Sequence, residues 1–332
     1  MNMEEHVIRW GILGVANIAK NAVIPGIVES KTGVVSGVAS RSLEKSQELV
    51  KELNQGRAYG SYQELLDDPS IDAVYIPLPN HLHKEWVIRA AKAKKHILCE
   101  KPIALTTEEV KEMKQACLEN EVLLFEAFMY RHQERYRKIQ SHINNGDIGE
   151  VRGIRSSFSF NNAQALDNFR MKPEYGGGSL YDVGVYPLSL ARMILKDEPE
   201  AVTVHSFTPE SHNGVDMVAS GLVEFSNGRF LTFDCGMWSA FRNDAEILGT
   251  KGRIVIEDAF TDGLKGFSLI IGNETNEIEV ADTNHYAKQV DFLARVLRKE
   301  TGLIYDIEDS ILNMKVLDAC LQSQKNRERV VL

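Results

Sequence analysis

The chain has 332 residues, of which 43% are hydrophobic and 26% are charged, and its formal net charge is −9. This composition is typical of a globular protein, and the acidic excess argues against nucleic-acid binding, which needs a basic face. The length predicts two domains, and no apolar run is long enough to make the protein a membrane protein.

The cysteines and histidines bound the chemistry further. The four cysteines are far apart with no C-x-x-C spacing, which is typical of reduced thiols. The N-terminus is polar and acidic, unlike a signal peptide, so we expect a cytoplasmic protein. His81 and His83 have no Cys, Asp or Glu at ligand spacing, so we expect no metal site.

The first predicted element is a strand, Val7–Leu13, which leads into a turn and a helix. The fingerprint G-x-G-x-x-G is represented here by Gly14-x-Ala16-x-x-Ala19. Small residues let backbone N–H groups approach a pyrophosphate, which the helix N-terminus also attracts. The residues predicted to form this nucleotide-binding turn are Gly14, Ala16, Asn17 and Ile18. The alternative is an ordinary strand-to-helix turn.

Apolar runs then alternate with amphipathic helices as far as residue 126. The further strand candidates are Val34–Ala39, Ala73–Ile76, His96–Cys99 and Leu123–Phe125. The helix starts are marked by Ser42 and by two capping boxes, Ser61 with Glu64 and Thr106 with Glu109. Pro25 is expected to end or bend the first helix. The alternation predicts a parallel sheet with helices on both faces.

Ligands of such sheets bind at the carboxyl ends of the strands, so the residues that follow each strand matter most. After Val34–Ala39, Ser40 and Arg41 stand where NAD-binding proteins usually carry Asp or Glu. They suit a ribose 2′-phosphate, which Lys45, one helical turn further on, can also reach. The alternative is a capped helix with solvated charges.

Two further loops complete the candidate site of the first half. The stretch after Ala73–Ile76 holds two prolines, which stiffen a surface for a flat ring, and then Asn80 and His83. The stretch after His96–Cys99 reads Glu100-Lys101-Pro102, a charged pair at the end of a buried strand. A cis bond before Pro102 would aim Lys101 inward. A surface Glu–Lys pair is the alternative.

From residue 127 the pattern changes to longer, alternating strands. The strand candidates are Val151–Phe160, Ala201–Phe207, Met217–Phe225, Arg229–Trp238, Asp244–Leu248 and Arg253–Glu257. Turn signals at 226–228 and 249–252 predict hairpins, and hence an antiparallel sheet with one face under helices. The helix candidates are Glu134–Asn144, Tyr181–Leu195, His285–Lys299 and Glu308–Lys325. Tyr286, Val290, Leu293 and Leu297 have the spacing of a helix packed on a core.

With these motifs in order, the chain resembles the glucose-fructose oxidoreductase / inositol dehydrogenase (Gfo/Idh/MocA) family. The resemblance rests on Gly14, Pro79-Asn80 with His83, Glu100-Lys101-Pro102 and the stretch Gly176–Tyr186. Tyr186 stands where many members carry His, as in the branch of glucose-fructose oxidoreductase, dimeric dihydrodiol dehydrogenase and NADP-dependent xylose dehydrogenase. Alanine at positions 16 and 19 departs from the simplest fingerprint.

The resemblance implies an α/β protein of two domains. Residues 1–126 would form a Rossmann dinucleotide-binding domain. Residues 127–332 would form an α+β domain with a large, mainly antiparallel, open-faced sheet, and the last helices can pack back on the first domain. The implied assembly is a homodimer or a dimer of dimers through that sheet, and the implied cofactor is NADP, with NAD as the alternative.

Hydride transfer at a carbinol carbon also needs a proton moved to or from the oxygen. The hypothesis is that Tyr186 is the acid/base and that the Lys101 ammonium lowers the pKa of its phenol. Asp182, one turn earlier, would orient the substrate or Lys101. Arg170 resembles the arginine that members carry beside the nicotinamide. The alternatives are a packing role for Tyr186 and a solvated Arg170.

The predicted function is therefore an NAD(P)-dependent oxidoreductase, with NADP(H) preferred. Its partner would be a small-molecule carbonyl or hydroxyl substrate: a sugar, polyol, cyclic diol or related carbonyl. The alternative function is a non-catalytic dinucleotide-binding sensor or regulatory protein, and the presence of both Lys101 and Tyr186 argues against it.

Overall fold

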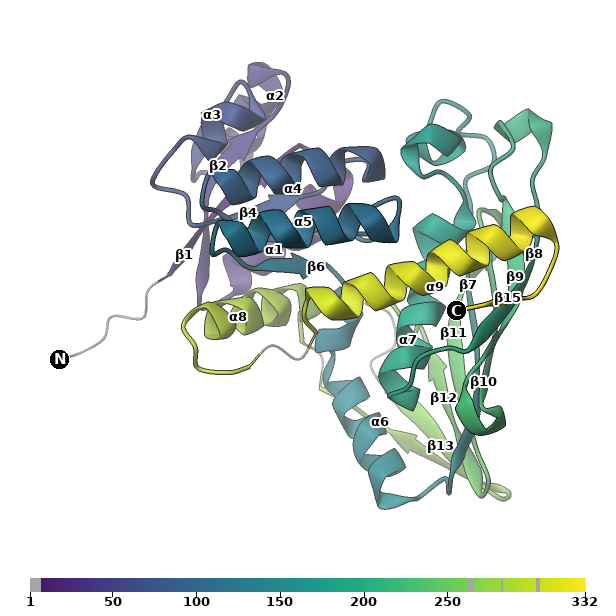
Figure 1. Ribbon diagram of the computed structural model, residues 1–332. Helices are drawn as coiled ribbons and strands as arrows, with labels where there is room; N and C mark the ends of the chain where they lie inside the picture. Colours follow the sequence, from purple (N-terminus) through teal and green to yellow (C-terminus); the bar gives the residue numbers. More distant parts are fainter. Residues whose placement is uncertain (1–6, 262–265, 282, 303–304) are drawn as a thin grey trace. The chain divides into compact units, whose positions relative to one another are not determined.

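The computed structural model describes residues 7–261, 266–281, 283–302 and 305–332. The chain forms two compact units, each built from two stretches of sequence (Figure 1). The first unit comprises Met1–His132 and Thr283–Ile311, and the second comprises Gln133–Asp282 and Leu312–Leu332. The domain boundary after residue 126 stays a prediction; by its contacts the chain passes between the units after His132.

The first unit is built on a parallel sheet of six strands in the order β3-β2-β1-β4-β5-β6. The strands are β1 (Ile8–Leu13), β2 (Gly33–Ala39), β3 (Arg57–Tyr59), β4 (Ala73–Ile76), β5 (His96–Cys99) and β6 (Leu124–Glu126). This is the predicted Rossmann arrangement, whose strand order reverses between β1 and β4. The short edge strand β3 was not predicted, because Arg57-Ala58-Tyr59 contains no apolar run.

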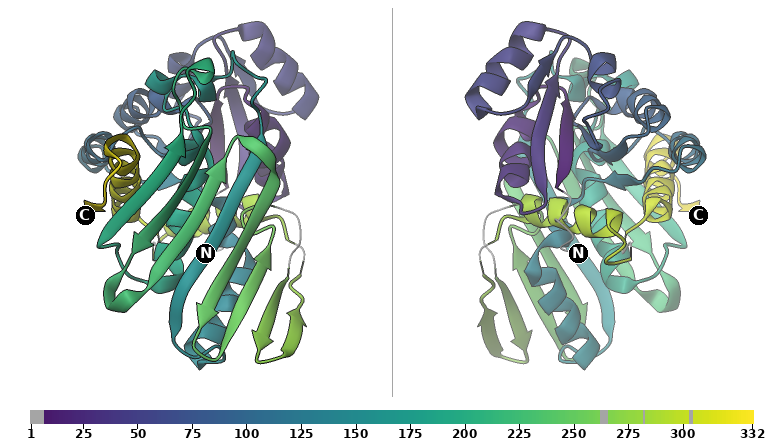
Figure 2. Two further views of the ribbon diagram at one scale, coloured as in Figure 1. Left: turned by 90° about the vertical axis from the view of Figure 1, so that its right-hand side faces the viewer. Right: turned by 90° about the vertical axis from the view of Figure 1, so that its left-hand side faces the viewer.

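Helices cover both faces of this sheet (Figure 2, right). They are α1 (Ile24–Glu29), α2 (Leu43–Leu53), α3 (Tyr62–Leu66), α4 (His83–Lys92), α5 (Thr107–Glu119) and α8 (His285–Leu297). The predicted caps are confirmed, since the side chains of Ser42, Ser61 and Thr106 accept from the backbone three residues on. Pro25 does not end the first helix, and the predicted alternative, a bend at Pro25, stays a prediction. A π turn, Ala19–Val23, continues into α1, and Pro25 lies in the first turn of α1.

The core of the first unit includes α8, which lies far away in the sequence. Val290 and Leu293 of α8 are buried with Trp10 and Ile12 of β1, and Tyr286 and Leu297 pack against the same cluster, which confirms the predicted core face of this helix. Helix α1 approaches α8 closely at Gly26, where an added Cβ would lie 2.5 Å from Cβ of Tyr286. The C-terminal part of the chain therefore contributes to the first unit.

The second unit is built on a sheet of nine strands in the order β14-β13-β12-β11-β7-β10-β9-β8-β15. The strands are β7 (Val151–Asn161), β8 (Ala201–Phe207), β9 (Val218–Glu224), β10 (Phe230–Gly236), β11 (Trp238–Gly249), β12 (Gly252–Glu257), β13 (Phe267–Ile271), β14 (Glu274–Ile278) and β15 (Val330–Val331). The neighbours β7 and β10 run parallel, and the other described pairs run antiparallel. The mainly antiparallel sheet is thus confirmed.

Several strand boundaries differ from the prediction. The strand predicted to end at Trp238 ends at Gly236, and Trp238 instead begins β11, of which the predicted Asp244–Leu248 is only a part. Strands β14 and β15 were not predicted, because β14 is polar and β15 has two residues. Strand β13 was also not predicted, although Phe267–Ile271 is an apolar run. The turns at Ser226–Gly228 and at 249–252 do join antiparallel pairs.

The helices of the second unit are α6 (Glu134–Asn145), α7 (Val185–Leu195) and most of α9 (Ile307–Asn326). Helix α9 is tied to the sheet by Ser323, whose Oγ accepts from the Val204 backbone at 2.9 Å. The opposite face of the sheet, which Figure 2 (left) turns toward the viewer, carries the exposed side chains of Phe207 and Leu222, which the register of β8 with β9 places on one face. The expected open-faced sheet is therefore present.

Candidate functional site

The turn after β1 has the backbone that the nucleotide-binding prediction requires. Gly14 has φ +125°, a value that residues with a side chain rarely adopt. Its N–H donates to the Ala39 carbonyl at 2.9 Å. A Cβ at Gly14 would lie 3.2 Å from the Leu78 side chain, so the turn packs closely on the loop after β4. The helix starts at Asn17, and the exposed Asn17 and Ile18 form its N-terminus, with Ala16 partly exposed just before it. The turn is therefore open to a ligand at the carboxyl edge of the sheet.

Basic side chains flank this turn at the end of β2. Ser40 is buried, whereas Arg41 and Lys45 are exposed. The hydroxyl of Tyr62 lies 4.0 Å from the position that a Cβ of Gly14 would take. Burial raises the pKa of Tyr62, while the charge of Arg41 and a hydrogen bond to it lower this pKa. Tyr62 thus connects Arg41 with the Gly14 turn.

Sequence reasoning missed Tyr62, although one signal was there. The aromatic residue follows directly on the helix cap Ser61. Its ring packs edge-on against Trp86, with ring centroids 4.8 Å apart. That packing holds its hydroxyl at the edge of the sheet.

The loop after β4 is held from inside the fold. Pro79 is partly exposed and Asn80 is 7% exposed. His83 is fully buried, and its ring nitrogens lie 2.7 Å from the Leu78 carbonyl and 3.0 Å from the Pro102 carbonyl. Burial lowers the pKa of His83 to about 4, so the ring is neutral and donates to one of these carbonyls. The structure therefore gives His83 a positioning role between two loops, and its place in the cofactor site stays a prediction.

The charged pair after β5 is anchored on its neighbouring strand. Tyr75 of β4 donates its hydroxyl to Glu100 at 2.5 Å, and the backbone N–H of Lys101 donates to the same carboxylate at 3.3 Å. Burial, followed by the charge of Glu100, raises the pKa of Tyr75 well above its ordinary value, so its hydroxyl keeps its proton. The peptide bond between Lys101 and Pro102 is cis. Glu100 is thus held by a buried phenol, with Lys101 next to it at the end of β5.

The second unit brings together the other predicted residues. Arg170 donates from Nε to Oδ2 of Asp182 at 2.7 Å, and its guanidinium lies over the Phe169 ring at 4.7 Å. Asp182 lies in a π turn, Leu180–Gly184, which continues into α7 and Tyr186. Such turns are common at functional sites. Arg170 and Asp182 therefore form a pair one turn before Tyr186.

The ring of Tyr186 packs in an aromatic cluster. Its centroid lies 5.2 Å from that of Phe158 on β7 and 5.2 Å from that of Phe260. The side chain is 5% exposed, so its ring serves packing as well as any chemistry of its hydroxyl. Lys101 belongs to the first unit and Tyr186 to the second, and their convergence stays a prediction.

A buried carboxylate that we did not predict caps the helix of Tyr186. Oδ2 of Asp216 accepts from Oγ of Ser179 and from the Leu180 backbone, both at 2.7 Å. Gly178, with φ +111°, is required beside it because a Cβ there would collide with the Asp216 carboxylate. Burial raises the pKa of Asp216 to about 6, while the hydrogen bonds lower it. The available signal was a single Asp between the apolar Val215 and Met217.

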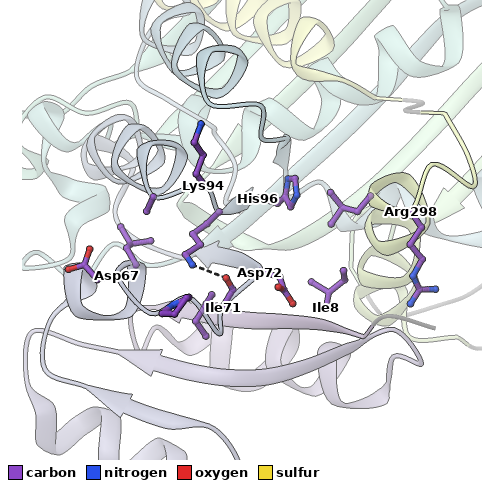
Figure 3. A pocket seen from close by; sticks show the side chains of 12 residues that line it. Ile8, Asp67, Ile71, Asp72, Lys94, His96 and Arg298 are labelled. Atoms are coloured by element: carbon purple, nitrogen blue, oxygen red, sulfur yellow. Dashed lines mark hydrogen bonds between the residues drawn. The ribbon is translucent and has the colours of Figure 1, made fainter. Parts of the chain in front are cut away.

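One described cavity of the first unit lies away from these residues. It has a volume of about 700 Å³ and lies at the amino ends of β1, β4 and β5 (Figure 3). Lys94 and Arg298 lie on opposite sides of it, and the Lys95 ammonium donates to the carbonyls of Asp68 and Ile71. Parallel sheets bind ligands at the opposite edge, and no predicted site residue lines this cavity, so we do not assign it to the reaction.

Among the residues that the structure describes, no three His, Cys, Asp or Glu side chains are grouped to hold a metal ion. In the same parts of the chain, no helix has both the length and the apolar character needed to cross a membrane.

Comparison with known proteins gives matches over most of the chain. Residues 8–128 match the oxidoreductase family with an NAD-binding Rossmann fold, and residues 136–255 match the GFO/IDH/MocA C-terminal domain. The chain is 36% identical to an uncharacterized oxidoreductase of Rhizobium meliloti, over 96% of this chain and 97% of the relative. It is 33% identical to D-xylose 1-dehydrogenase (NADP(+)) 2 of Haloferax volcanii, over 97% and 99% of the two chains.

A solved structure shares the fold over the same extent. It is the 3-ketoreductase KijD10 from Actinomadura kijaniata in complex with NADP and TDP-benzene, with a TM-score of 0.90 and 26% identity. The similarity covers 96% of this chain and 98% of that structure.

Proposed function

The chain belongs to the Gfo/Idh/MocA oxidoreductase family, and from this premise we propose that it catalyses NADP(H)-dependent hydride transfer with a Lys101–Tyr186 acid/base pair. The substrate class is a sugar, polyol, cyclic diol or related carbonyl. One observation carries the proposal: the Gly14 turn, the Pro77-Leu78 loop and Glu100-Lys101 follow the adjacent strands β1, β4 and β5 at the carboxyl edge of one sheet.

The residues at this edge fit a dinucleotide. Gly14 has the positive φ of a tight turn, and the helix N-terminus at Asn17 attracts a pyrophosphate. Arg41 beside Tyr62 supplies a guanidinium for a ribose 2′-phosphate, with Lys45 on the next helical turn. NADP also stands in the names of the xylose dehydrogenase and of the 3-ketoreductase complex, which supports the same cofactor here.

The remaining residues supply the proton chemistry. When bound, the nicotinamide supplies the hydride acceptor or donor. The Lys101 ammonium hydrogen-bonds the substrate oxygen and polarises the carbonyl, and Tyr186 gives or takes the proton at that oxygen. Asp182, paired with Arg170, orients the substrate beside Tyr186. The open face of the second sheet, with Phe207 and Leu222, is the proposed subunit interface.

Turnover with a defined set of substrates tests the proposal. We expect NADPH to be oxidised with α-dicarbonyls or ketosugars, or NADP⁺ to be reduced with sugars such as D-xylose, at about 1 to 10³ s⁻¹. The measurement is absorbance of the reduced cofactor, with NADH and NAD⁺ run in parallel. Tight binding of NADPH without turnover of any compound would support the sensor alternative instead.

The cofactor preference makes a separate prediction for Arg41. Arg41→Ala is expected to raise the KM for NADPH about 10- to 100-fold, because a hydrogen bond to a charged group contributes about 1.5 to 3 kcal/mol. The KM for NADH should change less than about twofold, because NADH has no 2′-phosphate. Lys51→Ala, which removes an exposed cation from the last turn of α2, is the matched control and should change neither value. Equal effects on both cofactors would contradict the assignment.

A further inference from the structure

The chain segment that carries Lys101 is held by two polar contacts directly after that residue. The Pro102 carbonyl lies 3.0 Å from Nδ1 of His83, and the Ile103 N–H donates to Oε1 of Glu126 at 3.1 Å. Pro102 and Ile103 are both buried. Both polar groups of the peptide unit between Pro102 and Ile103, the C=O and the N–H, are therefore in polar contact with side chains.

We propose that Glu126 is a positioning residue for Lys101, whose carboxylate fixes the Ile103 N–H and thereby the backbone that carries the Lys101 ammonium. The inference rests on the proposed role of Lys101. Glu126 does not act on the substrate itself; it acts through the two peptide units between Ile103 and Lys101.

Glu126 is suited to this role by its place in the sheet. It ends β6 and pairs with Cys99, the last residue of β5, so it stands beside the start of the Glu100-Lys101-Pro102 segment. The backbone N–H of Ala127 donates to the Cys99 carbonyl at 2.8 Å, which fixes the register of the two strand ends. Although the residue as a whole is only half-buried, its Oε2 atom is out of contact with solvent. A buried N–H such as that of Ile103 requires an acceptor here.

The titratable and polar groups around Glu126 come from three elements. The Cys99 thiol lies on the neighbouring strand, and burial and nearby carboxylates, Glu126 among them, raise its pKa, so it stays neutral. Arg131 faces Glu126, and its side chain is 5% exposed and pairs with Asp309 at 2.6 Å. Asp309 and Ser310, both near Glu126, come from α9, which lies far away in the sequence.

These surroundings make the hydrogen bond between the Ile103 N–H and Glu126 sensitive to pH near neutrality. Burial raises the pKa of Glu126 to about 7, while Arg131 and Ser310 lower it and Asp309 raises it. A carboxylate is a stronger acceptor than the protonated acid, so the Ile103 N–H is held best above this pKa. The contribution of Glu126 to the free energy of unfolding changes with pH in the opposite direction. It is fully present below the unfolded pKa of 4.5 and is lost as the pH rises to about 7.

Hydrogen exchange of two variants tests the hydrogen bond between the Ile103 N–H and Glu126 directly. In Glu126→Ala, the Ile103 amide is expected to exchange at least about tenfold faster, because its acceptor is gone. In Glu126→Gln, an amide oxygen replaces the carboxylate and most of the protection should return. Exchange resolved over overlapping peptides from residues 99 to 105 is the measurement. This measurement needs no turnover, so it tests the contact between Ile103 and Glu126 even if the proposed function is wrong.

Kinetics then separate positioning from stability. With NADP⁺ and D-xylose as the probe pair, Glu126→Ala should lower kcat about 10- to 100-fold and leave the KM for NADP⁺ within about twofold. Glu126→Gln should retain most of kcat and lose the part of the pH profile of kcat that rises near pH 7. A merely structural role would make kcat follow thermal stability, which changes with pH in the opposite direction.

The backbone N–H of Leu105, two residues after Ile103, offers a matched control. Glu109 accepts from the Leu105 backbone at 2.9 Å, which is the same contact made by the same residue type, but at the start of α5. Glu109→Ala should speed exchange of the Leu105 amide and leave kcat unchanged. An unchanged Ile103 amide in Glu126→Ala, or an equal loss of kcat in both alanine variants, overturns the inference. Full activity of Lys101→Ala would instead overturn the role of Lys101 in the proposed function.

Discussion

Replacing Lys101 with alanine is expected to lower kcat about 10²- to 10⁴-fold while NADPH still binds with nearly unchanged affinity. The ammonium at the end of β5 is proposed to act on the substrate oxygen, and the nucleotide is proposed to be held mainly by the Gly14 turn and by Arg41. Fluorescence titration with NADPH gives the affinity, and steady-state rates with the substrate from the screen give kcat.

Two further variants define what the loss means. Lys101→Arg keeps a cation that cannot lose its proton and has a different shape, so it should recover little activity. Lys94→Ala removes a lysine whose ammonium contacts the Asn120 carbonyl at 3.1 Å on the same unit, and it should leave kcat unchanged. Near-normal turnover of Lys101→Ala would exclude the acid/base pair.

Tyr186→Phe is expected to lower kcat by a similar factor, about 10²- to 10⁴-fold, with little change in the melting temperature. The substitution keeps the ring between Phe158 and Phe260 and removes only the hydroxyl, so the aromatic cluster stays packed. The measurements are kcat and thermal unfolding on the same samples.

A second buried tyrosine of the same unit supplies the control. Tyr136 donates its hydroxyl to the Ala259 carbonyl at 2.6 Å, so Tyr136→Phe removes a structural hydrogen bond. That variant should lose about 1 to 3 kcal/mol of stability and keep its kcat. If Tyr186→Phe instead lost stability and kept its kcat, the packing interpretation of Tyr186 would be correct.

The local patterns that predicted the first unit were reliable where strands are buried on both faces. Such strands are continuous apolar runs, as in Ala73–Ile76, and each was found with its following loop. The patterns failed for the edge strands β3, β14 and β15 and for β13, which lies inside its sheet. Strand β3 and strand β14 pair on the outside of their sheets with short or polar sequences, and their partners rather than their own residues hold them in place.

The sequence by itself determined the alternation of strands and helices, and with it which side chains follow the carboxyl ends of β1, β2, β4 and β5. Those features depend on residues a few positions apart, whose periodicity and turn chemistry act locally. Only the tertiary structure decided the supporting contacts: α8 on the core of β1, Tyr62 beside Arg41, Asp216 on the helix of Tyr186, and Glu126 on Ile103. Each of these joins residues far apart in the chain. A lone buried acid or tyrosine shows no periodicity that would reveal its partner.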